Sequence, residues 1–327
     1  MSAPGAGQGP AAPPAAGELI ARDKRALGRA ISLFEDARAE AAEARQALLA
    51  ALAAHPGRRR ARLVGVTGPP GAGKSTLVSE LARRLVAARP GWAVCVLAVD
   101  PSSERSGGAL LGDRVRARFP PEDDRLFFRS QASELELGGL GRHTFAVCRL
   151  LQHLFDCALV ETVGVGQSET AVQALADRTY LLLPPGFGDS IQLMKAGVME
   201  RPDAVLLAKQ DLPAAGAGAG AVAAELARRG GPPVPLHRVS GRTGFGLDAV
   251  VEEIAAIEPA PGARGPLEAR EPHFVAAWVR SEFGRSGLAA LAALGGAAAL
   301  VERAGGYDAA LARFPSEYRG WLSGPAD

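Results

Sequence analysis

A glycine-rich segment that ends in a lysine and a serine offers the clearest chemistry in the chain. Residues 68–75 have the sequence Gly-Pro-Pro-Gly-Ala-Gly-Lys-Ser. A turn of this composition lets backbone N–H groups surround phosphate oxygens, while the lysine adds a positive charge and the serine offers a hydroxyl to Mg²⁺. The pattern is that of a P-loop. It predicts phosphate binding by Gly71, Ala72, Gly73, Lys74, Ser75 and Thr76.

The sequence on either side of this segment predicts the strand and the helix that a P-loop requires. Residues 63–67 are an apolar run, and Leu77, Val78 and Leu81 follow at the spacing of one helix face. The alternative is a glycine turn in an ordinary α/β unit that binds nothing. Because Gly, Lys and Ser all stand where phosphate chemistry needs them, we expect Lys74 to be a catalytic charge on the phosphates.

Two acidic residues follow directly after further apolar runs. Residues 92–99 precede Asp100, and residues 157–160 precede Glu161. Runs that are apolar from end to end are typical of parallel strands covered on both faces, and active groups collect at the carboxyl ends of such strands. Asp100 and Glu161 are therefore predicted to serve Mg²⁺ together with Ser75. A turn residue and a helix cap are the respective alternatives.

Two glycine-rich loops contain further candidates. Asp113 is either a Mg²⁺ ligand or a solvated carboxylate, and the local sequence leaves both open. Residues 161–169, Glu-Thr-Val-Gly-Val-Gly-Gln-Ser-Glu, match the switch arrangement of P-loop nucleoside triphosphatases. In that arrangement the N–H of Gly164 senses the γ-phosphate, and Gln167 is a candidate to orient water, so both are predicted catalytic residues.

A third set of residues predicts the choice of base. The predicted strand 204–207 is followed by Ala-Lys-Gln-Asp. In many GTPases a carboxylate at this point accepts hydrogen bonds from the guanine N1–H and amine, which adenine lacks, and the lysine stem covers the ring. Ala208 replaces the usual Asn, and a surface Lys and Asp before a proline is the alternative. The predicted base-contacting residues are Lys209, Asp211, Ser240 and Gly241.

The order of apolar runs and amphipathic segments predicts an α/β fold of the P-loop NTPase type. Its mostly parallel central sheet is flanked by helices, with helical extensions at both ends of the chain. Further strands are predicted at 126–128, 179–183 and 236–239, and helices at 144–155, 190–200, 213–230 and 247–257. The predicted organisation is a disordered tail (1–17), an N-terminal extension of two helices (18–55), the P-loop domain (56–258), a linker (259–272) and a C-terminal helical arm (273–327).

Composition narrows the class of protein. The chain has 327 residues and a net charge of +2, which favours no nucleic-acid partner. Cys95, Cys148 and Cys157 lie in apolar segments, so they are predicted to be core residues in a reducing cytoplasm. No signal peptide is apparent, and the longest uncharged stretch after the N-terminal tail, around residues 287–301, is shorter than the roughly 20 apolar residues of a spanning helix. We expect neither a membrane segment nor a membrane partner.

Taken together, several segments resemble the MeaB/ArgK family of SIMIBI-class P-loop GTPases, over about residues 23–251. They are residues 68–75, 99–103, 111–113, 160–169 and 195–200. Members of that family are chaperones of adenosylcobalamin-dependent methylmalonyl-CoA mutase and its relatives. The resemblance implies a GTPase that binds GTP or GDP with Mg²⁺, with Lys74 and Ser75 on phosphate and metal. It assigns the metal and switch region to Asp100, Asp113 and Glu161.

The resemblance also implies a partner and an assembly. It implies GTP hydrolysis that gates cofactor loading and protects an acyl-CoA mutase, a mobile switch at residues 186–192, and a homodimer formed through the C-terminal arm. Three alternatives remain: a metal-insertion GTPase, which the lack of a Cys/His cluster disfavours; an ATP-using kinase linked to amino-acid transport, which Lys209 and Asp211 disfavour; and a binding module without activity.

Overall fold

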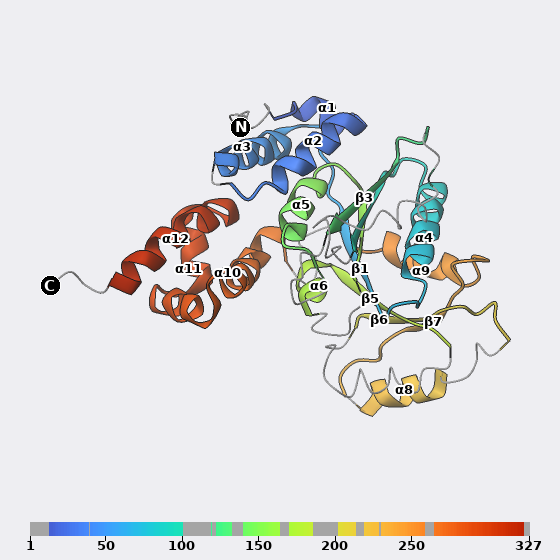
Figure 1. Ribbon diagram of the computed structural model, residues 1–327. Helices are drawn as coiled ribbons and strands as arrows, with labels where there is room; N and C mark the ends of the chain where they lie inside the picture. The colour runs from blue at the N-terminus through green and yellow to red at the C-terminus, as the bar shows by residue number, and fades with distance from the viewer. Residues whose placement is uncertain are drawn as a thin grey trace, which may run out of the picture. The chain divides into compact units, whose positions relative to one another are not determined.

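The computed structural model describes residues 13–38, 40–100, 119, 122–132, 140–163, 170–185, 202–213, 219–228, 230–258 and 265–323. The chain divides into two compact units (Figure 1). The sheet unit is Arg59–Arg270, and the helical unit combines Met1–Arg58 with Glu271–Asp327. The two ends of the sequence therefore belong to one unit, an association that the sequence pattern did not predict.

A seven-stranded parallel sheet organises the sheet unit. Its strand order is β3-β2-β4-β1-β5-β6-β7, and each neighbouring pair is parallel. The predicted fold class is thereby confirmed. The strands are β1 (Arg62–Thr67), β2 (Val94–Asp100), β3 (Leu126–Ala132), β4 (Cys157–Glu161), β5 (Arg178–Leu183), β6 (Ala204–Leu207) and β7 (Leu236–Arg238).

Helices cover both faces of this sheet, with α4 and α9 on one face and α5 and α6 on the other (Figure 1). Strand side chains alternate between the faces. Val66 and Leu182 therefore pack with α4 and α9, whereas Leu181 and Leu183 pack with α8. The helices are α4 (Lys74–Ala88), α5 (Thr144–Leu151), α6 (Thr170–Leu175), α8 (Ala219–Arg228), α9 (Leu247–Ala255) and the 3₁₀ helix η1 (Leu267–Arg270).

Some elements differ from their predicted bounds. β3 extends to Ala132 because it pairs with β2 along its whole length. The predicted strand ended at residue 128 because residues 129–131 are polar and do not continue the apolar run. α5 ends at Leu151, four residues before the predicted end, because turns follow it. The helix predicted at 213–230 is described only at Ala219–Arg228, and Pro213 lies in a turn. The helix predicted at 190–200 lies outside the described residues.

The helical unit contains six described helices, three from each end of the chain. They are α1 (Ala16–Ile20), α2 (Lys24–Phe34), α3 (Glu40–Ala54), α10 (Glu271–Ala293), α11 (Gly296–Ala304) and α12 (Tyr307–Ser323). The prediction of two N-terminal helices is therefore wrong, because the short α1 precedes them. α10 begins within the predicted linker, since Pro272 falls in the first helical turn, where no N–H is needed.

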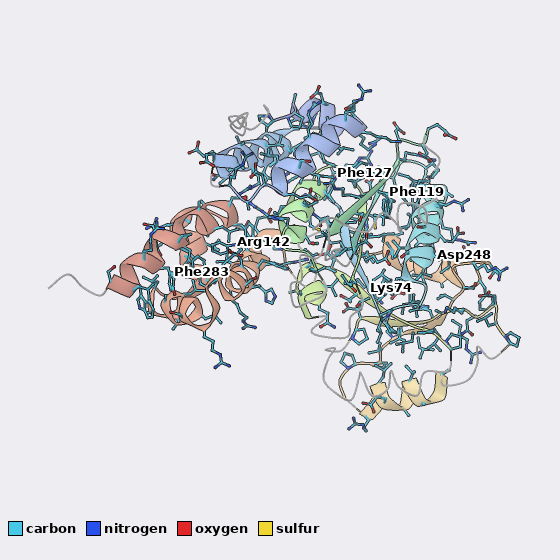
Figure 2. All side chains as sticks on the ribbon, viewed as in Figure 1. Lys74, Phe119, Phe127, Arg142, Asp248 and Phe283 are labelled. Carbon is cyan, nitrogen blue, oxygen red and sulfur yellow. The ribbon has the colours of Figure 1, made fainter. Side chains whose placement is uncertain are left out.

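Aromatic contacts connect α10 with α12 in the helical unit. Phe283, labelled in Figure 2, lies 5.2 Å from Phe314 and 5.0 Å from Tyr318 between ring centroids. α10 is kinked next to this ring, where Gly284 has φ 61° and ψ −148°.

No single helix among the described segments is long and apolar enough to cross a membrane. The bent pair Leu267–Ala293 and Gly296–Ala304 has the length and composition of a span only when its two helices are taken together.

The three cysteines are buried in the sheet unit, as predicted. Burial raises the pKa of the Cys148 thiol to about 12, and it raises the pKa values of Cys95 and Cys157 as well. A thiol with a raised pKa is a poor nucleophile and a poor metal ligand at neutral pH. The cysteines are thus packing residues.

A buried ion pair joins the two ends of the chain within the helical unit. Arg45 Nε on α3 donates to Asp308 Oδ1 on α12 at 2.5 Å, and neither residue is more than 6% exposed. The same guanidinium donates to the carbonyl oxygen of Asp36 at 2.5 Å. Because Arg45 is surrounded by acceptors and lies in the core, removing its carboxylate partner would leave a buried charge poorly compensated.

We predict that Asp308→Ala lowers the free energy of unfolding of the helical unit by about 3 kcal/mol or more, for this reason. Denaturant unfolding followed by circular dichroism measures the change. Arg313→Ala, which breaks an exposed pair with Glu317 on the same helix, is the matched control and should cost less than about 1 kcal/mol. Equal effects of the two substitutions would contradict the assignment.

Candidate active site

The P-loop has the geometry that its glycines require. β1 ends at Thr67 and α4 begins at Lys74, with residues 68–73 between them. Gly68 has φ 146°, and a Cβ there would lie 2.2 Å from the carbonyl oxygen of Leu182. Gly73 has φ 96° and is the N-cap of α4. The first amide groups of a helix have no helical partners and attract anions, so this turn has the geometry expected of a phosphate-binding segment.

Lys74, labelled in Figure 2, is the first residue of α4, and its side chain contacts the P-loop. Its Nζ donates to the carbonyl oxygens of Gly68 at 2.8 Å and Pro69 at 3.2 Å, and the residue is 7% exposed. The ammonium group is therefore held where the phosphates of a nucleotide are predicted to bind.

Ser75 and Glu161 meet at the point where α4 begins and β4 ends. Ser75 Oγ donates to Glu161 Oε1 at 2.7 Å. β4 is the neighbour of β1, and Glu161 is in register with Val66, so the strand order alone brings this carboxylate to the P-loop. The two residues, 86 positions apart in sequence, are the first pair of predicted metal-site residues that the fold brings together.

Asp100 lies on the same face of the sheet as Glu161. Ala98 is in register with Glu161, and Asp100 is two residues further along β2, so the two side chains point to the same side. Ser130 Oγ on β3 donates to Asp100 Oδ2. The sequence did not predict this role for Ser130, because the strand expected there ended at residue 128 and the order of the strands was not predicted.

These oxygen groups fit a Mg²⁺ site. Mg²⁺ prefers hard oxygen ligands and is usually held by one or two carboxylates together with substrate phosphates. A serine hydroxyl and two buried carboxylates at a P-loop supply such a set. Across the described segments, no group of three or more His, Cys, Asp or Glu is arranged to hold a metal by itself. Other predicted members lie outside the described residues: Asp113, Gly164, Gln167 and the loop 186–192.

A pocket of about 390 Å³ lies beside the P-loop. Ligand pockets commonly have volumes of about 300–1,000 Å³. The start of α4 and the loops after β6 and β7 form its walls. The predicted nucleotide-binding residues that line it are Ala72, Gly73, Thr76, Lys209, Asp211, Ser240 and Gly241. The sequence did not predict its apolar wall, which includes Leu77, Leu182 and Leu212.

Lys209 links the loop after β6 to the P-loop. Its Nζ donates to the carbonyl oxygen of Gly71 at 2.9 Å. Its backbone has φ 55°, a left-handed conformation that is uncommon for a residue with a side chain and is concentrated at functional sites. The loop therefore turns back toward the phosphate-binding segment, and the lysine stem lies along the pocket.

Asp211 is oriented by Ser240. Ser240 Oγ donates to Asp211 Oδ1 at 2.6 Å. Ser240 Oγ also accepts hydrogen bonds from the backbone N–H groups of Arg242 at 3.3 Å and Thr243 at 3.2 Å. Because a hydroxyl has one proton, these two donors direct that proton to the carboxylate. The hydrogen bond from Ser240 lowers the pKa of Asp211, so the carboxylate is ionised and accepts hydrogen bonds at neutral pH.

Ala208 also lines the pocket, where an asparagine was expected. Its N–H donates to the carbonyl oxygen of Leu183 at 2.7 Å, and its carbonyl oxygen accepts from Gln210 Nε2 at 3.3 Å. The N–H of Gln210 donates to the carbonyl oxygen of Val239 at 3.2 Å. Two backbone hydrogen bonds and one from the Gln210 side chain thus hold the start of this loop without an asparagine side chain.

A family model described as "Methylmalonyl Co-A mutase-associated GTPase MeaB" matches residues 27–292. The chain belongs to the MeaB family. It is a P-loop GTPase, and the resemblance predicted from its motifs is confirmed. The match also continues about 40 residues past the predicted end of the resemblance, into α10.

Individual relatives agree with this membership. A protein of Caulobacter vibrioides assigned as a GTPase is 39% identical over 268 residues, which is 80% of this chain and 81% of that one. The mouse methylmalonic aciduria type A homolog, named as mitochondrial, is 36% identical over 77% of this chain and 64% of its own. Alignments with relatives from Pyrococcus and Mycobacterium cover 55 to 60% of those chains.

A solved structure supports the fold of the MeaB-family chain. The crystal structure of an LAO/AO transport system kinase superposes with a TM-score of 0.56 and 26% sequence identity. The superposition covers 85% of each chain.

We predict that Asp211→Asn changes the base that the pocket prefers. The amide can donate to the carbonyl that xanthine has in place of the guanine amine, whereas it lacks the charge that accepts from guanine. Because a hydrogen bond to a charged group is worth about 1.5–3 kcal/mol, GDP affinity should fall about 10- to 100-fold while xanthosine diphosphate affinity rises. Calorimetric titration with both nucleotides measures this. An unchanged GDP affinity would show that the base binds elsewhere.

Proposed function

We propose that this MeaB-family GTPase hydrolyses GTP in a Mg²⁺-dependent reaction and acts as a chaperone of an adenosylcobalamin-dependent acyl-CoA mutase of the methylmalonyl-CoA mutase type. The main support is that the start of α4 combines a P-loop, the contact between Ser75 and the Glu161 carboxylate, and a pocket lined by the ionised Asp211, in a chain whose family is described by its association with that mutase. Each feature alone occurs in other nucleotide-binding proteins.

The phosphate side of the reaction depends on positioned charge. Lys74 and the first amide groups of α4 neutralise negative charge that develops on the phosphates, and no covalent enzyme intermediate is required. Mg²⁺, when bound, supplies further positive charge to the phosphate oxygens. Ser75 is proposed to hold that metal directly, with Glu161 and Asp100 in its ligand shell. Gly164 and Gln167 are proposed to contact the γ-phosphate and orient water, respectively.

The base side selects guanine. Asp211, held by Ser240, accepts from the N1–H and the exocyclic amine of guanine, and adenine offers no such pair of donors. This argument favours GTP over ATP, although the solved structure with the similar fold is that of an LAO/AO transport system kinase.

The proposal includes the biological assembly. GTP hydrolysis would gate cofactor loading and protect the mutase, residues 186–192 would respond to the client, and the C-terminal arm at 273–327 would form a homodimer in the cytoplasm. The exposed Trp321 and Leu322 near the end of α12 support an apolar contact in this arm. We expect turnover to be slow until the client completes the site.

Steady-state hydrolysis of GTP and of ATP, with and without a methylmalonyl-CoA mutase from the same organism, tests this proposal. We predict turnover that is selective for GTP and accelerated by the mutase, because the client is proposed to complete the site around the γ-phosphate. Lys74→Ala is the control variant and should abolish turnover in both conditions.

Two other results would each overturn part of the proposal. Preferential ATP hydrolysis would favour a transport-linked kinase and would refute the role of Asp211. GTP hydrolysis that the mutase leaves unchanged would refute the chaperone assignment and would point to another client.

A further inference from the structure

A pair of buried threonine hydroxyls connects the two strands that lead into the phosphate-binding segments. Thr162 Oγ1 donates to Thr67 Oγ1 at 2.9 Å, and the residues are 1% and 0% exposed. Thr67 is the last residue of β1, directly before the P-loop, and Thr162 directly follows Glu161. Neither threonine contributed to the predicted site.

This hydrogen bond extends the pairing of β1 and β4 beyond its last register pair. That pair is Val66 and Glu161, and the N–H of Thr162 then donates to the carbonyl oxygen of Val66 at 3.1 Å. The side-chain bond joins the two chains one residue further along. Because both side chains are short and buried, a hydrogen bond between their hydroxyls restricts the separation of the two backbones.

Both catalytic segments are attached to this pair through the main chain. Gly68, which follows Thr67, accepts from Lys74 Nζ at 2.8 Å. Glu161, which precedes Thr162, accepts from Ser75 Oγ at 2.7 Å. Val66 packs on the α4 face of the sheet, so the side chain of Thr67 points to the opposite face. The threonine pair therefore lies on the side of the sheet opposite to α4.

We propose that Thr67 and Thr162 are positioning residues for GTP hydrolysis. Their hydrogen bond sets the distance between the P-loop and the end of β4, and hence the placement of the Lys74 ammonium relative to the Glu161 carboxylate. This inference rests on the proposed hydrolytic function. A displacement of about 1 Å at such a site can lower the rate about 100-fold. Loss of a contact that fixes two catalytic segments should therefore lower kcat.

A cycle of valine substitutions separates positioning from simple burial. Thr67→Val or Thr162→Val alone leaves one buried hydroxyl without its partner, which costs stability. The double substitution removes both hydroxyls and keeps both shapes, which is nearly neutral for stability. If the pair only satisfies burial, the double variant recovers both stability and activity. If the pair positions the site, the double variant recovers stability alone.

We expect the single valine variants to lower Tm by about 2–4 °C and the double variant to return within about 2 °C of the wild type. In all three variants kcat for GTP should fall about tenfold or more, while KM and GDP affinity change less than about threefold. Thr162→Ser, which keeps the hydroxyl, should retain most of the wild-type kcat. The readouts are thermal unfolding, steady-state kinetics and calorimetric titration with GDP.

Thr179→Val is the matched control. Thr179 is fully buried on β5, and its hydroxyl has no hydrogen-bond partner within the part of the chain that the structure describes. Its substitution should leave kcat unchanged. A stable double variant with wild-type kcat would overturn the proposal, as would a Thr162→Ser variant as slow as Thr162→Val. Absence of GTP hydrolysis by the wild type with its mutase would instead refute the proposed function.

Discussion

The hydrogen bond between Ser75 and Glu161 is the contact on which the proposed site depends. It joins the start of α4 to the end of β4, so it exists only if β4 lies beside β1 and if the P-loop turns the helix back over the sheet. The parallel order places the carboxyl ends of β1, β2 and β4 along one edge of the sheet, and Asp100 reaches the same face as Glu161. The Ser75 hydroxyl and the Glu161 carboxylate thus lie together at the P-loop, and Asp100 adds a second carboxylate on the same face, which are the hard oxygen groups that Mg²⁺ prefers.

The phosphate half and the base half of the proposed site are built from different parts of the chain, the first mainly from backbone and the second from side chains. The proposed phosphate half is built mainly from backbone, since it consists of glycines with positive φ and a helix N-terminus, and Lys74 adds positive charge. The base half is built from side chains on two loops, in which Ser240 orients Asp211 and Lys209 contacts the P-loop. The contact between Lys209 and the P-loop couples the two halves, because movement of the base loop would move the Lys209 ammonium group away from the carbonyl oxygen of Gly71.

The motifs predicted the parallel sheet and much of the grouping of site residues, because each motif follows an apolar strand and the ends of parallel strands meet. They did not predict supporting contacts between residues distant in sequence. Ser130 and Thr67 lie in strands and Thr162 directly follows one, and only the strand order brings them to their partners. The Arg45–Asp308 pair could not be predicted from the sequence either, since its members are 263 residues apart and neither lies in a motif. The positive φ of Lys209 has no residue-type signal at all.

The Mg²⁺ dependence of nucleotide binding, compared between the wild type and Glu161→Gln, tests the central claim most directly. Substitution of groups around a bound metal typically costs about 10–100-fold in metal affinity. Calorimetric titration of GDP at a series of Mg²⁺ concentrations should therefore show that Glu161→Gln needs at least about tenfold more Mg²⁺, while GDP affinity in excess chelator is unchanged. An identical Mg²⁺ dependence in the two proteins would contradict the role assigned to the Ser75 and Glu161 pair.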